Sequence, residues 1–296
     1  MAKANFDKLL EAGAHFGHLK RKWNPAMAPY IFTEKNGIHI IDLHKTVVKL
    51  DEAAAALKQI AKSGKKVLFV ATKKQAKTLV ANKVRNVNMP FVTERWPGGM
   101  LTNFATIRRS VRKMATIDKM STDGTFNNIS KKERLSIARQ RAKLENQFGS
   151  IADLTRIPAA IFIVDIVKEH IAVAEAKRLN IPTFAIVDTN ADPNQVDYAI
   201  PANDDASASI DYIIEVVTNA IQEGLSERKI DKDKEALERE KAAEEGTNEE
   251  AKRAKKMELI EADVDEEHEE SVKEKRKIQK KIVSTKKTGG KPEKKD

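Results

Sequence analysis

Five short and nearly continuous apolar runs recur through the middle of the chain. They lie at residues 67–71 (VLFVA), 90–92, 160–164 (AIFIV), 183–187 (TFAIV) and 198–200. Runs without alternation are typical of strands buried on both faces, because neither side of such a strand faces water. Helical patterns lie among these runs, at residues 73–83, 168–179 and 206–224. Strands interspersed with helices predict an α/β fold with a parallel sheet flanked by helices.

The residues before the first run predict smaller elements around this sheet. Asn5 is the expected cap of a short helix that ends at Gly13, and residues 44–63 form a second helix that Gly64 ends. The segment 37–41 (GIHII) alternates too little for an exposed strand. We therefore expect it to pack against the main body.

Between the second and third apolar runs, residues 103–148 predict an inserted helical hairpin. At about 100° per residue, one side of its first half is apolar and the opposite side is basic. The apolar positions are Phe104, Ile107, Val111, Met114 and Ile117, and the basic positions are Arg108, Arg109, Arg112, Lys113 and Lys119. In the second half, Ile137, Leu144, Phe148 and Ile151 recur in the four-three spacing of a short coiled-coil seam, interrupted only by Arg141. We expect the two apolar stripes to bury each other.

The ends of these two helices are marked as well. Asn103 is the expected cap of the first helix, and residues 121–128 are rich in residues that end helices. Ser130 and Glu133 form a capping box that begins the second helix. A segment with these signals leaves the sheet, turns back and returns to it.

The net charge of +10 is unevenly distributed along the chain. Residues 1–102 hold 18 Lys and Arg against 7 Asp and Glu, residues 103–148 hold 11 against 4, and residues 149–225 hold 4 against 12. A helix face that is merely solvated usually mixes both signs. A strongly basic hairpin therefore predicts a phosphate backbone as its partner.

The composition excludes several kinds of site. Because the chain has no cysteine, it has no disulfide framework, thiolate metal site or cysteine nucleophile. Neither a GxGxxG nor a GxxxxGK[ST] nucleotide motif occurs. The beginning of the chain lacks the apolar run of a signal peptide, and no run of about 18 apolar residues occurs. We expect a soluble cytoplasmic protein.

The segment 15–25 (HFGHLKRKWNP) is a candidate for contact with nucleic acid. Three consecutive basic residues suit phosphates, and the ring of Trp23 suits stacking on a base or ribose. His15 and His18 also suggest a metal site, but no carboxylate or thiolate lies close to them in the sequence. Buried or RNA-facing histidines are the favoured interpretation.

Two turns of the core offer further basic groups. Lys73 and Lys74 stand where a helix begins after the first apolar run, a place that offers free N–H groups to an anion, although they could also simply cover the helix start. In the segment 95–103 (RWPGGMLTN), Pro97 followed by Gly98 suits a type II turn that Trp96 anchors to the body. This turn can act as a tight hinge, as an RNA contact, or as both.

Aspartates follow the later apolar runs and leave an enzymatic alternative open. They are Asp165, Asp188, Asp192, Asp204 and Asp205. Carboxylates at the carboxyl edge of a parallel sheet are what a magnesium-dependent, phosphate-handling flavodoxin-like enzyme needs. No serine or histidine is suggestively paired with them as nucleophile and base, and aspartate is also common as a cap or turn residue.

Residues 226–296 change abruptly in composition to Lys, Glu, Ala and Asp with few large apolar residues. Such a segment cannot bury enough surface to fold by itself. We expect a disordered tail or a frayed single helix, whose lysine-rich end could touch RNA.

Several motifs agree in order and spacing with one known family. They are HFGH, WNPAM, IHIIDL, RWPGGMLTNF, PAAIFIVD, AIVDTNADP and IPANDDA. Over residues 4–225 the chain resembles the bacterial small-subunit ribosomal protein S2 family, although Pro97 stands where that family usually has leucine. The resemblance implies a flavodoxin-like sheet with an inserted hairpin. It also implies a structural, non-enzymatic component that binds small-subunit (16S-type) rRNA, contacts neighbouring small-subunit proteins and helps to recruit ribosomal protein S1.

These observations predict an α/β flavodoxin-like domain from residues 1–102 and 149–225, a basic hairpin at 103–148 and a charged tail at 226–296. We expect no catalytic residue, no cofactor and no metal site. We also expect neither a membrane nor a small-molecule substrate as a partner. The residues expected to contact RNA are Lys20, Arg21, Lys22, Trp23, Lys73, Lys74, Arg95, Gly98, Gly99, Asn103, Arg108, Arg109, Arg112, Lys113, Lys131, Lys132 and Arg134.

Overall fold

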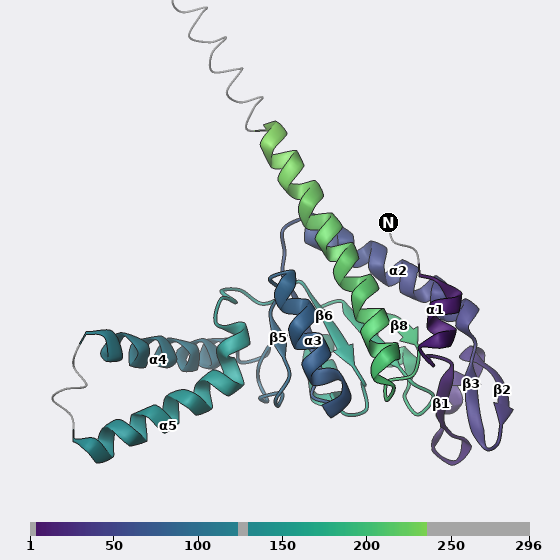
Figure 1. Cartoon of the computed structure of the whole chain (residues 1–296), viewed down its shortest axis with the longest axis horizontal. Coiled ribbons are helices and arrows are strands. Elements are labelled where there is room, and N and C mark those ends of the chain that lie inside the picture. The colour runs from purple at the N-terminus through teal and green to yellow at the C-terminus, as the bar shows by residue number, and fades with distance from the viewer. Residues whose placement is uncertain (1–3, 124–129, 236–296) are drawn as a thin grey trace, which may run out of the picture. The chain divides into compact units, whose positions relative to one another are not determined.

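A computed structural model describes residues 4–123 and 130–235 (Figure 1). The chain divides into two units at residue 230, and the first, residues 1–230, holds nearly all of the described residues. The first unit contains a five-stranded parallel sheet made of β4 (Val67–Val70), β5 (Phe91–Val92), β6 (Ala160–Val164), β7 (Thr183–Val187) and β8 (Tyr198–Pro201). The strand order is β5-β4-β6-β7-β8. Counted along the chain this is the flavodoxin-like order, so the predicted fold class is confirmed.

The strands alternate their side chains between two apolar cores, one on each face of the sheet. Val67 and Phe69 belong to one core, whereas Leu68 and Val70 belong to the other. The first core is covered by α2 (Leu43–Lys62), α3 (Lys74–Asn86) and the helix that begins at residue 207. The second is covered by α6 (His170–Arg178) and the segment around Trp96. Burial on both faces is why these strands appear in the sequence as unbroken apolar runs.

The predicted cap of the first helix and the predicted ends of the first two helices are confirmed. The Asn5 side chain accepts a hydrogen bond from the backbone N–H of Asp7 at the start of α1 (Phe6–Glu11), and Gly13 follows with a φ of 71°. Gly64, with a φ of 76°, follows α2. A positive φ is the conformation that favours glycine after a helix, which explains why both helices end there.

The first unit also contains a second sheet that the sequence did not predict. It is antiparallel, with the order β1-β3-β2, and consists of β1 (Phe16–Leu19), β2 (Ile31–Lys35) and β3 (Ile38–Ile41). Segment 37–41, expected only to pack against the body, supplies its central strand. Asn36 and Gly37 have φ values of 52° and 76° between β2 and β3. This Asn-Gly pair is the signal of a tight hairpin and could have revealed the sheet.

The helix that begins at residue 207 is described to residue 235, beyond the expected end at 224. The predicted tail lies outside the described residues from 236 onward. Among the residues that the structure describes, no helix is both long enough and apolar enough to cross a membrane.

Candidate nucleic-acid interface

Two antiparallel helices, α4 (Phe104–Thr122) and α5 (Lys131–Phe148), form the inserted hairpin, which we call the arm (Figure 1). The apolar face of α4 is buried at Ile107, Val111, Met114 and Ile117. In α5, Phe148 is buried, while Ile137 and Leu144 are half-buried. The Ser130 hydroxyl accepts a hydrogen bond from the Glu133 N–H, as the capping box predicts. The apolar seam therefore stabilises the arm and leaves its other faces to solvent.

Two arginines of the arm serve its own structure. Arg108 is half-buried, and its guanidinium donates hydrogen bonds to the carbonyl oxygens of Ala152 at 3.4 Å and Leu154 at 3.0 Å. Arg141 interrupts the seam, where its Nε lies 2.6 Å from an Asp118 oxygen on α4. Arg108 was expected to contact RNA, but its position makes it a link between α4 and the chain that returns to the sheet.

The remaining cations of the arm are exposed. They are Arg109, Arg112, Lys113, Lys119, Lys131, Lys132, Arg134, Arg139 and Lys143. A helical pair that displays this many cations and few acids attracts a polyanion and repels other basic surfaces. All cations of the arm that were predicted to contact RNA, except Arg108, are therefore accessible to a phosphate backbone.

The turn that leads into the arm differs in detail from the prediction. The Met100 N–H donates to the Pro97 carbonyl at 3.1 Å, and the residue with positive φ is Gly99, at 81°, not Gly98. Pro97 therefore occupies the first position of the turn instead of the second. Asn103 stands at the predicted cap position of α4, but its side chain accepts from the Thr106 hydroxyl and makes no cap bond to the backbone. Both glycine expectations for RNA contact stay predictions.

A second basic region lies beside β1, in the short turn Lys20–Lys22 that we call the η1 segment. Arg21 and Lys22 are exposed, whereas Lys20 forms an ion pair with Glu34 at 2.7 Å. Trp23 is half-buried, with its ring 5.1 Å from that of His39. Figure 1 shows the arm and the β1–β3 sheet at opposite ends of the first unit. The arm and the η1 segment are thus two separate basic regions of the first unit.

Lys73 and Lys74 are neighbours in the sequence but have opposite environments. Lys74 is exposed at the start of α3. The Lys73 side chain is only 11% exposed, and its ammonium lies 2.7 Å from Asp204, 2.6 Å from Asp205 and 3.5 Å from Asp165. A cation that these carboxylates already neutralise offers little to a phosphate. We therefore withdraw Lys73 from the candidate interface.

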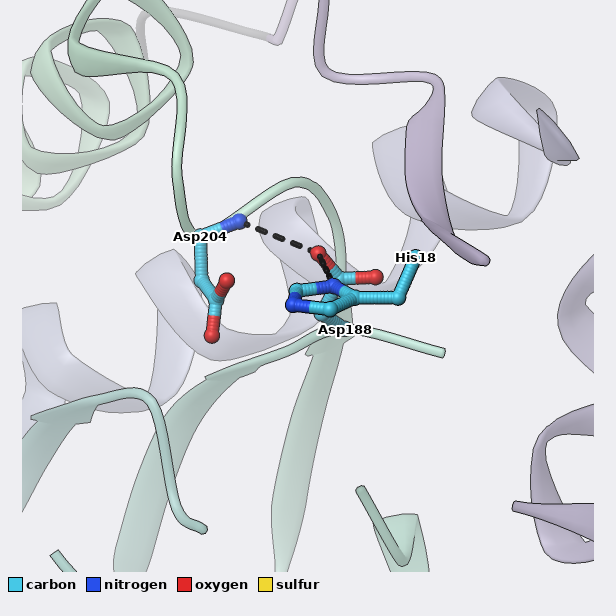
Figure 2. A group of neighbouring side chains, drawn as sticks. All are labelled: His18, Asp188 and Asp204. Atoms are coloured by element: carbon cyan, nitrogen blue, oxygen red, sulfur yellow. Dashed lines mark hydrogen bonds and ion pairs between the residues drawn. The ribbon is translucent and has the colours of Figure 1, made fainter. Parts of the chain in front are cut away.

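His18 completes this group of charges, which we call the carboxyl-edge cluster; Figure 2 shows its members His18, Asp188 and Asp204. It consists of His18, Lys73, Asp165, Asp188, Asp204 and Asp205. His18 Nδ1 lies 2.9 Å from Asp188, and Nε2 lies 3.5 Å from Asp205. No histidine was suggestively paired with these aspartates as a base in the sequence, whereas the structure places His18 in contact with two of them. His18 comes from β1 of the unpredicted sheet, so no local pattern could place it here.

The electrostatics of the cluster follow from its burial. Burial and the nearby charges of Asp188 and Asp165 raise the pKa of Asp204 to about 7. The hydrogen bond to Asp188 raises the pKa of His18, although its own partial burial opposes this. Because desolvation favours neutral groups and opposite charges favour ionised ones, this cluster holds charges that depend on one another.

The cluster fills the place where a flavodoxin-like sheet normally binds a ligand. The strand order reverses between β4 and β6, and the ammonium of Lys73, which follows β4, lies 3.5 Å from Asp165, which follows β6. Within the described residues, ligand atoms of His18, Asp188 and Asp204 lie within 4.8 Å of one another and could hold a metal ion. Asp192, expected beside Asp165 and Asp188, instead caps a short turn by accepting from the Asn194 N–H.

Comparisons with known proteins all indicate one family, and the matches cover most of the chain. A sequence model of the family described as Ribosomal protein S2 matches residues 9–224. The protein named Small ribosomal subunit protein uS2 in Phocaeicola vulgatus is 71% identical over 232 residues, which cover 78% of this chain and 83% of that protein. Its namesake in Bacteroides thetaiotaomicron is 65% identical over 263 residues (89% and 93%), and that of Flavobacterium johnsoniae is 64% identical over 242 residues (82% and 95%).

Proposed function

Because the chain belongs to the ribosomal protein S2 family, whose members are structural, non-enzymatic constituents of the small ribosomal subunit, we propose that it binds small-subunit rRNA. The protein acts in translation as part of a cytoplasmic ribonucleoprotein. The observation that carries the proposal is the exposed row of cations along both helices of the arm. These groups contact the phosphate backbone, which gives affinity and orientation without reading sequence.

The two basic regions have different tasks in this proposal. The arm reaches RNA through Arg109, Arg112, Lys113, Lys131, Lys132 and Arg134, and the η1 segment contributes Lys20, Arg21 and Lys22 together with the adjacent Trp23. Lys74, Arg95, Gly98, Gly99 and Asn103 lie between the regions in the sequence and complete the set. Since the regions lie at opposite ends of the first unit, the RNA spans the molecule or folds around it (Figure 1). Recognition of this kind depends on the shape of the RNA and on electrostatics.

Reversing the charge of the arm tests the proposal. A variant with Arg109→Glu, Arg112→Glu and Lys113→Glu should co-sediment with small subunits at a clearly lower level, because three exposed cations become anions. The control carries Arg156→Glu, Lys177→Glu and Arg178→Glu, which make the same change of charge at exposed sites outside both basic regions. If both variants co-sedimented equally poorly, the loss would come from the change of net charge and not from the position of the cations on the arm. Unchanged sedimentation of the arm variant would remove the arm from RNA binding.

We further propose that the acidic part of the chain helps to hold ribosomal protein S1 on the small subunit. Two features support this: the family resemblance, and the excess of 12 Asp and Glu over 4 Lys and Arg in residues 149–225, which makes this part unsuited to RNA. Small subunits reconstituted without this protein should carry less ribosomal protein S1, and adding the protein should restore it. Equal amounts of S1 with and without the protein would contradict the proposal.

A further inference from the structure

One buried carboxylate gathers the hydrogen bonds of the turn that leads into the arm. Glu175 of α6 is 8% exposed. Its Oε1 accepts from the Trp96 indole N–H at 3.1 Å and from the Gly99 N–H at 2.7 Å. Its Oε2 accepts from the Leu101 N–H at 2.9 Å and from the N–H and hydroxyl of Thr102, both at 3.1 Å. Every one of these donors lies in residues 96–102, directly before α4.

Glu169, the residue directly before α6, is a second buried glutamate with which Glu175 can be compared. It is also buried, at 4% exposed, and it bonds to Thr72. Burial raises the pKa of Glu169 above its ordinary value. Burial also acts to raise the pKa of Glu175, but the bonds from Thr102, Leu101, Trp96 and Gly99 outweigh it, and the pKa lies below its ordinary value. The turn is therefore built around an ionised carboxylate.

Apolar packing connects the same turn to the arm on one side and to α6 on the other. Trp96 and Leu101 belong to the apolar core that also contains Val173 of α6 and Ile107 and Val111 of α4. Trp96 is 6% exposed and Leu101 is 2% exposed. Backbone held at both ends by packing and in the middle by charged hydrogen bonds has little freedom to rotate.

We propose that Glu175 is a positioning residue that fixes the direction in which the arm leaves the sheet. Two carboxylate oxygens bind five donors of one short turn, and α4 begins two residues after the last of them. Glu175 therefore determines where the arm's exposed cations lie. That this placement serves contact with rRNA rests on the proposed function.

The chemistry distinguishes three substitutions. Glu175→Gln keeps the size of the side chain but replaces an acceptor oxygen with an NH₂ group that faces N–H donors. Glu175→Ala removes the carboxylate and leaves the donors converging on a space that acetate, the missing fragment, can fill. Glu169→Gln is the matched control, because it changes a buried glutamate directly before the same helix that bonds to Thr72 and not to the turn.

The orientation of the arm can be measured on the full chain. Since the chain has no cysteine, spin labels can be placed at Asn82→Cys on α3 and Ala138→Cys on α5, both exposed. Pulsed electron resonance should give one narrow distance distribution for the parent protein and for Glu169→Gln. Glu175→Gln and Glu175→Ala should broaden or displace it, and acetate should restore it for Glu175→Ala where chloride at equal ionic strength does not. An unchanged distribution in both Glu175 variants would overturn the proposal.

A second measurement keeps the test decisive if the Glu175 variants do not fold. In the unaltered protein, the amides of Gly99, Leu101 and Thr102 should exchange with solvent at least about tenfold more slowly than those of the exposed residues Arg21 and Lys22, because each of the three is bonded to an ionised carboxylate. Rapid exchange of all three would overturn the proposal.

The role of Glu175 and the proposed function can fail separately. If the label distance changes in the Glu175 variants while rRNA binding is unaffected by reversing the arm's charges, Glu175 keeps its role and the proposed function fails. If the reverse holds, only the role of Glu175 fails.

Discussion

The arm and the carboxyl edge of the parallel sheet both concentrate charge, but they use it in opposite ways. In the arm, cations such as Arg109 and Arg112 point to solvent and the partner of the two helices is an apolar seam. At the carboxyl edge, Lys73 and His18 contact aspartates from three loops. Charge that is available to another molecule therefore depends on which distant loops supply counter-charges. The number of basic residues in a segment does not reveal this.

The largest expected effect is a difference in stability between variants at the neighbouring residues Lys73 and Lys74. Lys73→Met should lower the free energy of unfolding by about 3 kcal/mol at pH 8, because it leaves Asp165, Asp204 and Asp205 without their cation. Lys74→Met removes the same charge from an exposed neighbour and should change stability by less than about 0.5 kcal/mol. Urea denaturation of both variants measures the difference. Similar stabilities would mean that the carboxyl-edge cluster does not depend on Lys73.

A smaller effect separates two adjacent arginines within the arm. Arg108→Ala should cost about 2 kcal/mol of stability, since it removes charged hydrogen bonds to the returning chain. Arg109→Ala should leave the melting temperature nearly unchanged and weaken only the binding of rRNA. Thermal unfolding and an rRNA binding assay on the same two variants check this. If Arg109→Ala were the destabilising one, the assignment of these residues to structure and surface would be reversed.

The smallest expected effect is that the hydrogen bonds of residues 96–102, the turn that leads into the arm, depend on pH. The pKa of Glu175 is lower in the folded protein than its ordinary value of 4.5. Its contribution to stability is therefore complete above pH 4.5 and is lost as the pH falls through the folded pKa. Amide exchange of Leu101 and Thr102 should lose its protection in that range, and the Glu175→Gln variant should lack this step. Protection that stays constant down to pH 2 would contradict the ionised state of Glu175.

The sequence predicts those parts of the fold whose cause is local. The strands β6 and β7 match their predicted bounds because burial on both faces leaves an unmistakable apolar run. The arm's seam and the Ser130 cap follow from helical periodicity and from a side chain that reaches only three residues ahead. In each case the residues that cause the structure lie next to one another in the chain.

The parts that escaped prediction depend on distant residues or on exposed strands. In β2, only Ile31 is even partly buried, so no alternation marks the strand and only Asn36 and Gly37 signal the hairpin. The contact of His18 with Asp188 joins two sheets across 170 positions of the chain. The hydrogen bonds of Glu175 likewise join α6 to a turn more than seventy residues earlier. Such contacts require the folded arrangement of the strands before they can be inferred.

The central claim is that the exposed charges of the arm, in contrast to those at the carboxyl edge, contact rRNA. The most direct test is the salt dependence of the affinity for small-subunit rRNA, measured for the unaltered protein and for a variant with Arg109→Gln, Arg112→Gln and Lys113→Gln. If each side chain neutralises one phosphate, the slope of log K against log salt should become shallower by about 3 in the variant. An identical slope in both proteins would contradict the claim.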